Sequence, residues 1–341
     1  MSAVVIAGIL VIALNAYVLL GGADFGGGVW DLLARGPRKG AQREFVAHAI
    51  GPVWEANHVW LILVLVLLFT CFPAAFTRLA VTLNLPLTGV LLGIVLRGSA
   101  FAFRGYGGDR DVVQRRWGRV FAIASLVTPI LLGVTVGAIA SGQLGEGGSG
   151  KGEGYFASYV ATWLTPFTVC VGLFTLACFA FLAAVYLTLE VPAGPLREDF
   201  RARALAAGLV VILLAGLSLL LAQSGAPRME AGLTLSRWAV SFHVATGAAA
   251  VTALTALWTR RFALARIAAA AQVSLIVWGW AWSQYPYVVP PDLTIAASAS
   301  PRATLRLVLG ALVVGAAVLF PSLFYLFRVF KSSDAVRNAS S

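Results

Sequence analysis

The sequence contains few charged residues and few residues that bind metals or form disulfides. Of its 341 residues only 11% are charged, and it has 3 cysteines, 3 histidines and 2 methionines, while 60% are hydrophobic. A soluble domain has about 25% charged and about 45–50% apolar residues. This composition excludes a disordered chain, a disulfide-rich secreted domain and an ordinary water-soluble enzyme. It describes a protein most of whose surface faces lipid.

The three cysteines form no redox or zinc motif, since the sequence has neither a CxxC pair nor a Cys/His spacing typical of zinc sites. Cys170 and Cys178 lie on one predicted helix, about 12 Å apart at a rise of about 1.5 Å per residue. That separation is too large for a disulfide. We therefore expect these two residues and Cys71 to be packed core thiols.

Long apolar runs dominate the chain. A membrane helix needs about 20 mainly apolar residues. Nine runs meet this requirement, and they cover about 3–27, 54–76, 79–103, 119–141, 162–187, 203–223, 236–258, 262–284 and 304–328. No soluble domain fits in the loops, so we expect a single polytopic membrane domain over 1–341. The Pro-rich segment that starts at Gln284 cannot be helical throughout.

The basic residues predict the orientation in the membrane. Nine spans place the two termini on opposite sides, and Lys and Arg are about three times as frequent on the side of the C-terminus. Because cytoplasmic loops carry an excess of Lys and Arg, we expect the N-terminus outside and the C-terminus in the cytoplasm. The net charge of +11 is therefore interpreted as a topology signal, with no nucleic-acid partner.

Ionisable residues inside the spans are the first candidates for function, because they are costly there. Asp24, Glu55, His58 and Arg97 share one predicted depth, the cytoplasmic third of the membrane. This predicts a polar pocket open to the cytoplasm, where the two carboxyls pass protons. Two structural alternatives stay open. Arg97 snorkels to the interface, or it forms a structural ion pair with one of the carboxyls.

The histidines offer little for metal or haem binding. Glu55 and His58 have the i, i+3 spacing of di-iron bundles, but those sites need two such motifs and only one occurs here, so we expect no metal site. His58 and His243 are the only histidines within spans, so axial haem ligands are scarce. We expect His243 to be a hydrogen-bonded core histidine and His48 to be solvated in a basic loop.

Glycines surround Asp24. Gly22 and Gly26 form a GxxxG pair that continues into Gly27 and Gly28, and this pattern makes a smooth face for close helix contact. A carboxylate within such a face would be held against a neighbouring helix, away from lipid.

Two motifs resemble subunit II of cytochrome bd-type quinol oxidases. They are GGADFGGGVW at 21–30 and GPVWEANHVWL at 51–61, which is followed by Phe72-Pro73. The second motif matches the family pattern at Pro52, Trp54, Glu55, Asn57, Val59 and Trp60, and further likeness comes from Arg97, Phe101 and Arg104, from Tyr285-Pro286 and from Leu293-Thr294. The chain departs from many members, which have Asp in place of Glu55 and a further Asp in place of Gly21.

The resemblance implies an all-α integral membrane fold with nine transmembrane helices, arranged as two four-helix bundles plus one peripheral helix. It implies a partner, subunit I, that carries b-type haem, haem d and the quinol site in a bacterial plasma (inner) membrane. The pair would oxidise quinol, reduce O2 to water and generate a proton gradient without pumping. Subunit II would bind no haem. The resemblance also allows for a structural quinone and a small single-helix accessory subunit.

The resemblance also implies roles for individual residues. Glu55 corresponds to the family's proton-path residue, and we predict that it is the main relay with Asp24 as an accessory. Trp54, Asn57 and Arg97 would shape the pocket. Two other functions stay open on the residues alone. Buried acids also occur in ion-coupled membrane transporters, although no inverted repeat is detected, and the chain could be a purely structural membrane scaffold subunit.

Overall fold

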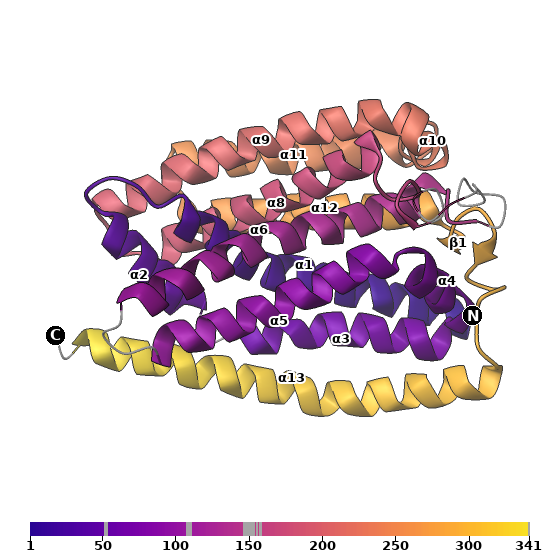
Figure 1. Ribbon diagram of the computed structural model, residues 1–341, viewed down its shortest axis with the longest axis horizontal. Coiled ribbons are helices and arrows are strands. Elements are labelled where there is room, and N and C mark those ends of the chain that lie inside the picture. The colour runs from indigo at the N-terminus through magenta and orange to yellow at the C-terminus, as the bar shows by residue number, and fades with distance from the viewer. Residues whose placement is uncertain (51–53, 107–110, 146–153, 155, 157–158, 340–341) are drawn as a thin grey trace.

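The computed structural model describes residues 1–50, 54–106, 111–145, 154, 156 and 159–339, and it shows long helices lying side by side (Figure 1). In this described part, eight helices are long and apolar enough to cross a membrane, or nine if the bent pair α3 and α4 is one span. The predicted all-α membrane fold is confirmed. The elements are α1 (Ser2–Leu32), α2 (Lys39–Ile50), α3 (Trp54–Cys71), α4 (Pro73–Thr82), α5 (Asn84–Tyr106), α6 (Asp111–Ser141), α8 (Pro166–Glu190), α9 (Pro195–Gly225), α10 (Pro227–Thr234), α11 (Ala239–Trp258), α12 (Phe262–Gln284), β1 (Tyr287–Val289), β2 (Leu293–Thr294) and α13 (Arg302–Ala339).

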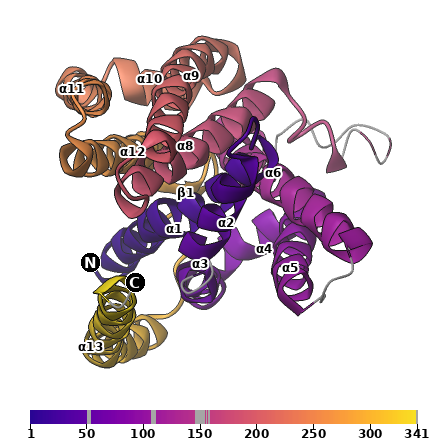
Figure 2. The same cartoon turned by 90° about the vertical axis from the view of Figure 1, so that its left-hand side faces the viewer.

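The long helices form two groups. One group contains α1, α3, α5 and α6, and the other contains α8, α9, α11 and α12 (Figure 2). The groups are joined where α1 and α6 pack against α8, while α13 lies outside both and touches α1 and α3. This is the arrangement expected from the resemblance, with two four-helix groups and one peripheral helix.

The predicted second and third spans differ most from the structure. The chain leaves the helix at Phe72 (φ −135°, ψ 58°), because Pro73 has no N–H to continue the hydrogen-bond ladder. Helix α4 bends away from α3 by 116°, and α5 then starts at Asn84. The two predicted runs over 54–76 and 79–103 are therefore three helices.

The end of the bundle that holds α4, α10 and the hairpin β1–β2 also holds the N-terminus (Figure 1). The hairpin lies in the Pro-rich segment after Gln284, so the prediction that this segment is not helical throughout is confirmed. Just before α13, the backbone N–H of Ser300 donates to the carbonyl of Cys71 at 2.9 Å, and the Ser300 hydroxyl donates to the carbonyl of Thr70 at 2.7 Å. These bonds attach the start of α13 to the end of α3.

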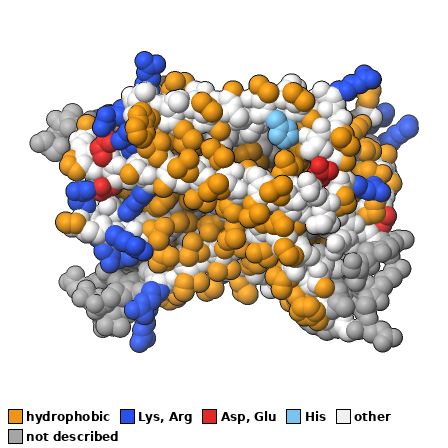
Figure 3. Space-filling model, turned by 90° about the horizontal axis from the view of Figure 1, so that it is seen from above, with side chains coloured by type: hydrophobic (Ala, Val, Ile, Leu, Met, Phe, Trp, Pro, Cys, Tyr) orange, Lys and Arg blue, Asp and Glu red, His pale blue; other side chains and the backbone are white. Residues whose placement is uncertain are grey.

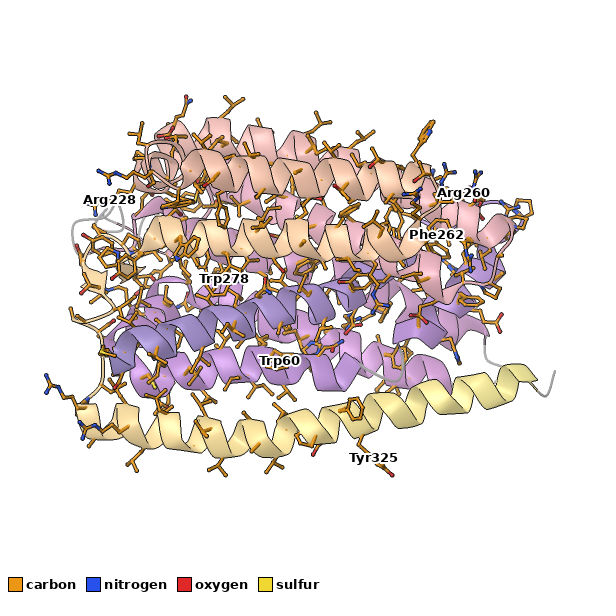
Figure 4. The ribbon with its side chains drawn as sticks, turned by 180° about the vertical axis from the view of Figure 1, so that it is seen from behind. Trp60, Arg228, Arg260, Phe262, Trp278 and Tyr325 are labelled. Carbon is orange, nitrogen blue, oxygen red and sulfur yellow. The ribbon has the colours of Figure 1, made fainter. Side chains whose placement is uncertain are left out.

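The opposite end, called here the basic end, is where α1, α5, α8 and α11 finish and α9 and α12 begin. Arg260 lies at the basic end and Arg228 at the other end (Figure 4). Arg38 and Asp199 pair at 2.6 Å, and Glu198 pairs with Arg201 at 2.7 Å and with Arg260 at 2.9 Å. Exposed pairs of this kind contribute little to stability, because water and salt screen their charges. Between the two charged ends the surface is largely hydrophobic, as a membrane protein requires (Figure 3).

Glycines let α1 approach α8 closely, as the GxxxG pattern predicts. A Cβ added at Gly22 would lie 2.6 Å from the ring of Phe179, and one at Gly26 would overlap the carbonyl group of Phe179. One turn further along α1, the indole N–H of Trp30 donates to the carbonyl of Ala180 at 2.8 Å. The three cysteines are buried and free, which confirms that they are core thiols.

Replacing Gly26 by alanine is expected to destabilise the protein by about 1 to 3 kcal/mol, the usual cost of overpacking. The new methyl group meets backbone, so the two helices must separate. The matched control is Gly8→Ala on the same helix, where an added Cβ has no atom within 4 Å. Thermal denaturation of the purified protein measures the difference. Equal melting temperatures for the two variants would contradict close packing at Gly26.

Candidate functional site

Three polar side chains from α1, α3 and α5 meet toward the basic end of the bundle. Asp24, Asn57 and Arg97 are exposed by only 7%, 5% and 2%. The side-chain amide of Asn57 donates to Oδ2 of Asp24 at 2.6 Å. The guanidinium of Arg97 donates from Nη2 to the main-chain carbonyl of Asp24 at 2.8 Å and from Nε to the hydroxyl of Ser125 at 3.3 Å. Asp24 is thus bound through both its side chain and its main chain.

Arg97 is enclosed by aromatic rings as well as by hydrogen-bond acceptors. Its guanidinium carbon lies 4.7 Å from the ring centroid of Phe25 and 5.2 Å from that of Phe121. Cation–π contacts of this geometry stabilise a buried guanidinium. The alternative that Arg97 snorkels to the interface is therefore wrong, because the side chain points into the contact between helices. Its hydrogen bond to Asp24 goes to the main chain, while the carboxyl is bound by Asn57.

Glu55 and Trp54 belong to the first turn of α3, but their side chains lie outside the described residues. The backbone of Glu55 is two residues before Asn57, toward the basic end. The structure brings Asp24, Asn57 and Arg97 together, and the roles predicted for these three residues, for Glu55 and for Trp54 all stay predictions.

Tyr17 and His58 continue this cluster along α1 and α3. The ring centroid of His58 lies 6.0 Å from that of Tyr17 and 6.0 Å from that of Phe25, with edge-on geometry in both pairs. Tyr17 is buried, and its hydroxyl finds no hydrogen-bond partner among the described residues. The sequence analysis missed Tyr17 and Ser125, because a tyrosine or a serine in an apolar helix is common and carries no signal of its own.

The two remaining histidines are both exposed. His243 of α11 pairs through Nδ1 with the carbonyl of Ala239 at 2.8 Å, so the predicted hydrogen bond is present. Its predicted place in the core is wrong, because the side chain faces the outside of the bundle. His48 is exposed as expected, although it lies in α2 rather than in a loop. Within the described residues, no group of three or more His, Cys, Asp and Glu side chains is arranged to hold a metal ion.

Comparison with known proteins identifies the family of this chain. Residues 2–330 match the family model described as cytochrome bd terminal oxidase subunit II. The chain belongs to this family. It is therefore a subunit of a quinol oxidase, which is an oxidoreductase complex, and a multi-pass protein of the bacterial inner membrane whose partner is subunit I. Because the chain belongs to this family, its function is not that of an ion-coupled transporter, which was one of the alternatives that the residues alone left open.

One relative of this cytochrome bd subunit matches most of its length, and another matches about a third of it. The chain is 22% identical over 326 residues to a Bacillus subtilis (strain 168) protein named "Putative cytochrome bd menaquinol oxidase subunit II", covering 92% of this chain and 91% of the relative. It is 33% identical over 118 residues to the cytochrome bd ubiquinol oxidase subunit 2 of the same strain, covering 35% of this chain and 34% of that one. Among solved structures, the bd oxidase from Geobacillus thermodenitrificans matches with a TM-score of 0.78 at 22% identity, over 96% of this chain and 98% of that chain. The last match shows that the fold is shared.

Proposed function

We propose that this cytochrome bd subunit II supports a haem-bearing subunit I and carries protons from the cytoplasm toward the site of O2 reduction. In this proposal the partner holds haem b and haem d, and subunit II binds no haem. Quinol is oxidised at the outer face and O2 is reduced to water. The chain crosses the membrane nine times, with its N-terminus outside and the basic end in the cytoplasm.

The buried carboxyl of Asp24 is the observation that carries the proposal. Ionisable side chains within membrane spans are rare and mark proton relays and ion paths. The amide of Asn57 fixes this carboxyl at 2.6 Å, and the helix contact around it excludes lipid. A carboxyl held within hydrogen-bond reach of polar groups is suited to accept and release a proton. Glu55, which starts α3 nearer the basic end, would receive protons first, with Asp24 as the accessory group.

A purely structural role is the second candidate, and Arg97 favours it. Its hydrogen bonds connect α1, α5 and α6 through the Asp24 main-chain carbonyl and the Ser125 hydroxyl, two acceptors that do not titrate. The two functions differ in what a mutation would remove. A relay residue sets the turnover of each assembled complex, whereas a structural residue sets how much haem-loaded complex forms.

Replacing Asp24 by asparagine is expected to lower the turnover of the complex about tenfold, because the proton is lost while the size of the side chain is kept. The measurement is quinol-dependent O2 uptake of the purified complex, divided by the haem content from its optical spectrum. Asp292→Asn is the control, since Asp292 is exposed at the opposite end of the bundle. Unchanged turnover in Asp24→Asn would remove Asp24 from the relay, and a loss of haem in proportion to activity would support the structural role.

A further inference from the structure

Buried polar side chains occupy only one part of the helix group formed by α1, α3, α5 and α6. Among the described residues of these helices, the buried polar side chains are those of Asp24, Asp31, Asn57, Arg97, Ser125 and Thr128. Relative to its own helix, Thr128 lies farthest from the basic end, and it is only two residues past the midpoint of α6. The interior of this group is therefore polar from the basic end to about its middle.

The other half of the same group, toward the N-terminus of the chain, has an apolar interior. Within the described part of the chain, every fully buried side chain there is apolar or a thiol, and most belong to one cluster, called here the apolar plug. Its members include Ile6, Leu67, Cys71, Phe72, Leu83 and Ala138, of which Leu67 is exposed by 1% and the others by 0%. They come from α1, α3, α6 and both ends of α4, so the plug spans the whole width of the group.

The polar side chain of α1 that is nearest to the plug is outside it. Asn15 lies nine residues after Ile6, and at about 100° per residue it starts on the opposite face of the helix. Its exposure is intermediate, whereas Ile6 is fully buried. The amide therefore does not interrupt the apolar interior.

The end of α3 is closed by protein groups instead of water. The last carbonyl groups of a helix have no partner within the helix and are often hydrated. Here the N–H and the hydroxyl of Ser300 donate to the carbonyls of Cys71 and Thr70 at 2.9 Å and 2.7 Å. Helix α4 and the hairpin β1–β2 lie at the same end of the bundle (Figure 1). Two carbonyl groups beside the plug thus need no water.

Protons move through proteins along hydrogen-bonded water molecules or along polar side chains within about 3 Å of each other. A buried water needs two to four polar partners, and an apolar interior offers none. A bare charge in such an interior is strongly disfavoured. From Tyr17, at the midpoint of α1, to Ile6 the helix rises by about 16 Å, at about 1.5 Å per residue. A proton in the polar half therefore has no path of this kind across the plug.

We propose that the apolar plug is the proton barrier of this subunit, which separates the polar half of the group from the membrane face at the N-terminal end. The inference rests on the proposed function, in which protons enter from the basic end. A relay that reached both faces of the membrane would let protons flow back and dissipate the gradient that the oxidase generates. With the plug in place, protons that reach Asp24 leave this subunit only sideways, toward subunit I.

Passive proton permeability of the complex in liposomes tests the barrier, because it is measured without quinol and therefore without turnover. A potassium diffusion potential set with valinomycin drives the protons, and a pH-sensitive dye inside the liposomes records the rate. Leu67→Asn places an amide inside the plug and gives water a hydrogen-bond partner there. We expect it to raise the rate about fivefold over the unmodified complex, the factor that one hydrogen bond provides.

Two matched controls make the result specific. Leu65→Asn is the same substitution two residues away on α3, at a side chain that is 44% exposed, and it should leave the permeability unchanged. Cys71→Ser and Cys178→Ser form a second pair, in which both thiols are buried and only Cys71 belongs to the plug. Serine is close to cysteine in size, so this pair decides the matter if haem content shows that Leu67→Asn does not assemble. Cys71→Ser should raise the permeability, and Cys178→Ser should not.

Three outcomes would overturn the proposal. They are unchanged permeability in both plug variants, an equal increase in Leu67→Asn and Leu65→Asn, and an equal increase in Cys71→Ser and Cys178→Ser.

A double variant distinguishes the plug from the relay. If the leak of Leu67→Asn passes through the proposed relay, adding Asp24→Asn should return the rate to that of the unmodified complex. A leak that persists would remove Asp24 from the path and leave the plug as the barrier. Unchanged permeability in the plug variants, together with lowered turnover in Asp24→Asn, would reject the plug and leave the relay.

Discussion

Replacing Glu55 by glutamine is expected to lower quinol-dependent O2 uptake about a hundredfold at nearly normal haem content, because a relay without a titratable proton loses its acid–base function. Glutamine keeps the length of the side chain and removes only its titratable proton. The measurement is the rate of O2 uptake per haem in the purified complex. Glu55→Gln is expected to lower O2 uptake per haem more than Asp24→Asn does, since Glu55 is proposed to receive protons first.

Two further variants control this experiment. Glu55→Asp retains the carboxyl and should keep most of the turnover. Glu44→Gln removes an exposed glutamate from α2 and should leave turnover unchanged. Full activity of Glu55→Gln would end the relay hypothesis for this residue. A parallel loss of haem and activity would assign Glu55 to assembly.

The second large effect is expected at Arg97. Replacing it by methionine should destabilise the subunit by about 3 kcal/mol, because methionine fills most of the space but two buried hydrogen-bond acceptors and two aromatic rings lose the guanidinium. The Asp24 carbonyl, the Ser125 hydroxyl and the rings of Phe25 and Phe121 all lose the guanidinium. Thermal denaturation of the purified complex and the yield of assembled, haem-containing complex measure the loss.

Arg97→Lys separates charge from geometry. Lysine keeps the positive charge but lacks the planar fork that donates in two directions and stacks on rings. We expect an intermediate stability, with turnover per haem close to normal in the complex that does assemble. A lysine variant as stable as the unmodified protein would show that charge alone is needed. A methionine variant of normal stability would contradict the structural role of Arg97.

The polar cluster could be predicted from the sequence because its members are rare where they occur. Asp24 and Arg97 are conspicuous within apolar spans, and Asn57 lies in a motif shared with the family. Ser125 could not be found in this way, since a serine in an apolar helix has no distinguishing spacing and acquires its role only when α6 packs beside α5. Tyr17 is a similar case, because its place beside the ring of His58 follows only from the packing of α1 against α3.

The positions of the membrane helices followed from apolar runs, but two structural details did not. The hydropathy of the chain continues across Phe72 and Pro73, so composition could not show that α4 turns by 116° away from α3. For His243, a core position and a lipid-facing position are both apolar environments. A lone histidine in an apolar run therefore cannot be assigned to either side from sequence, and only the packing of α11 decided it.

The attachment of Ser300 to Thr70 and Cys71 has a consequence for biosynthesis. The partner of the Thr70 carbonyl follows 230 residues later in the chain. Because a ribosome delivers the chain from its N-terminus at about 5–20 residues per second, the end of α3 has to wait for more than half of the protein to be translated. During that interval its carbonyl groups must be hydrated or otherwise bonded. The contact between the start of α13 and the end of α3 therefore forms only after the last membrane span has been made, although α3 is among the first helices to enter the bilayer.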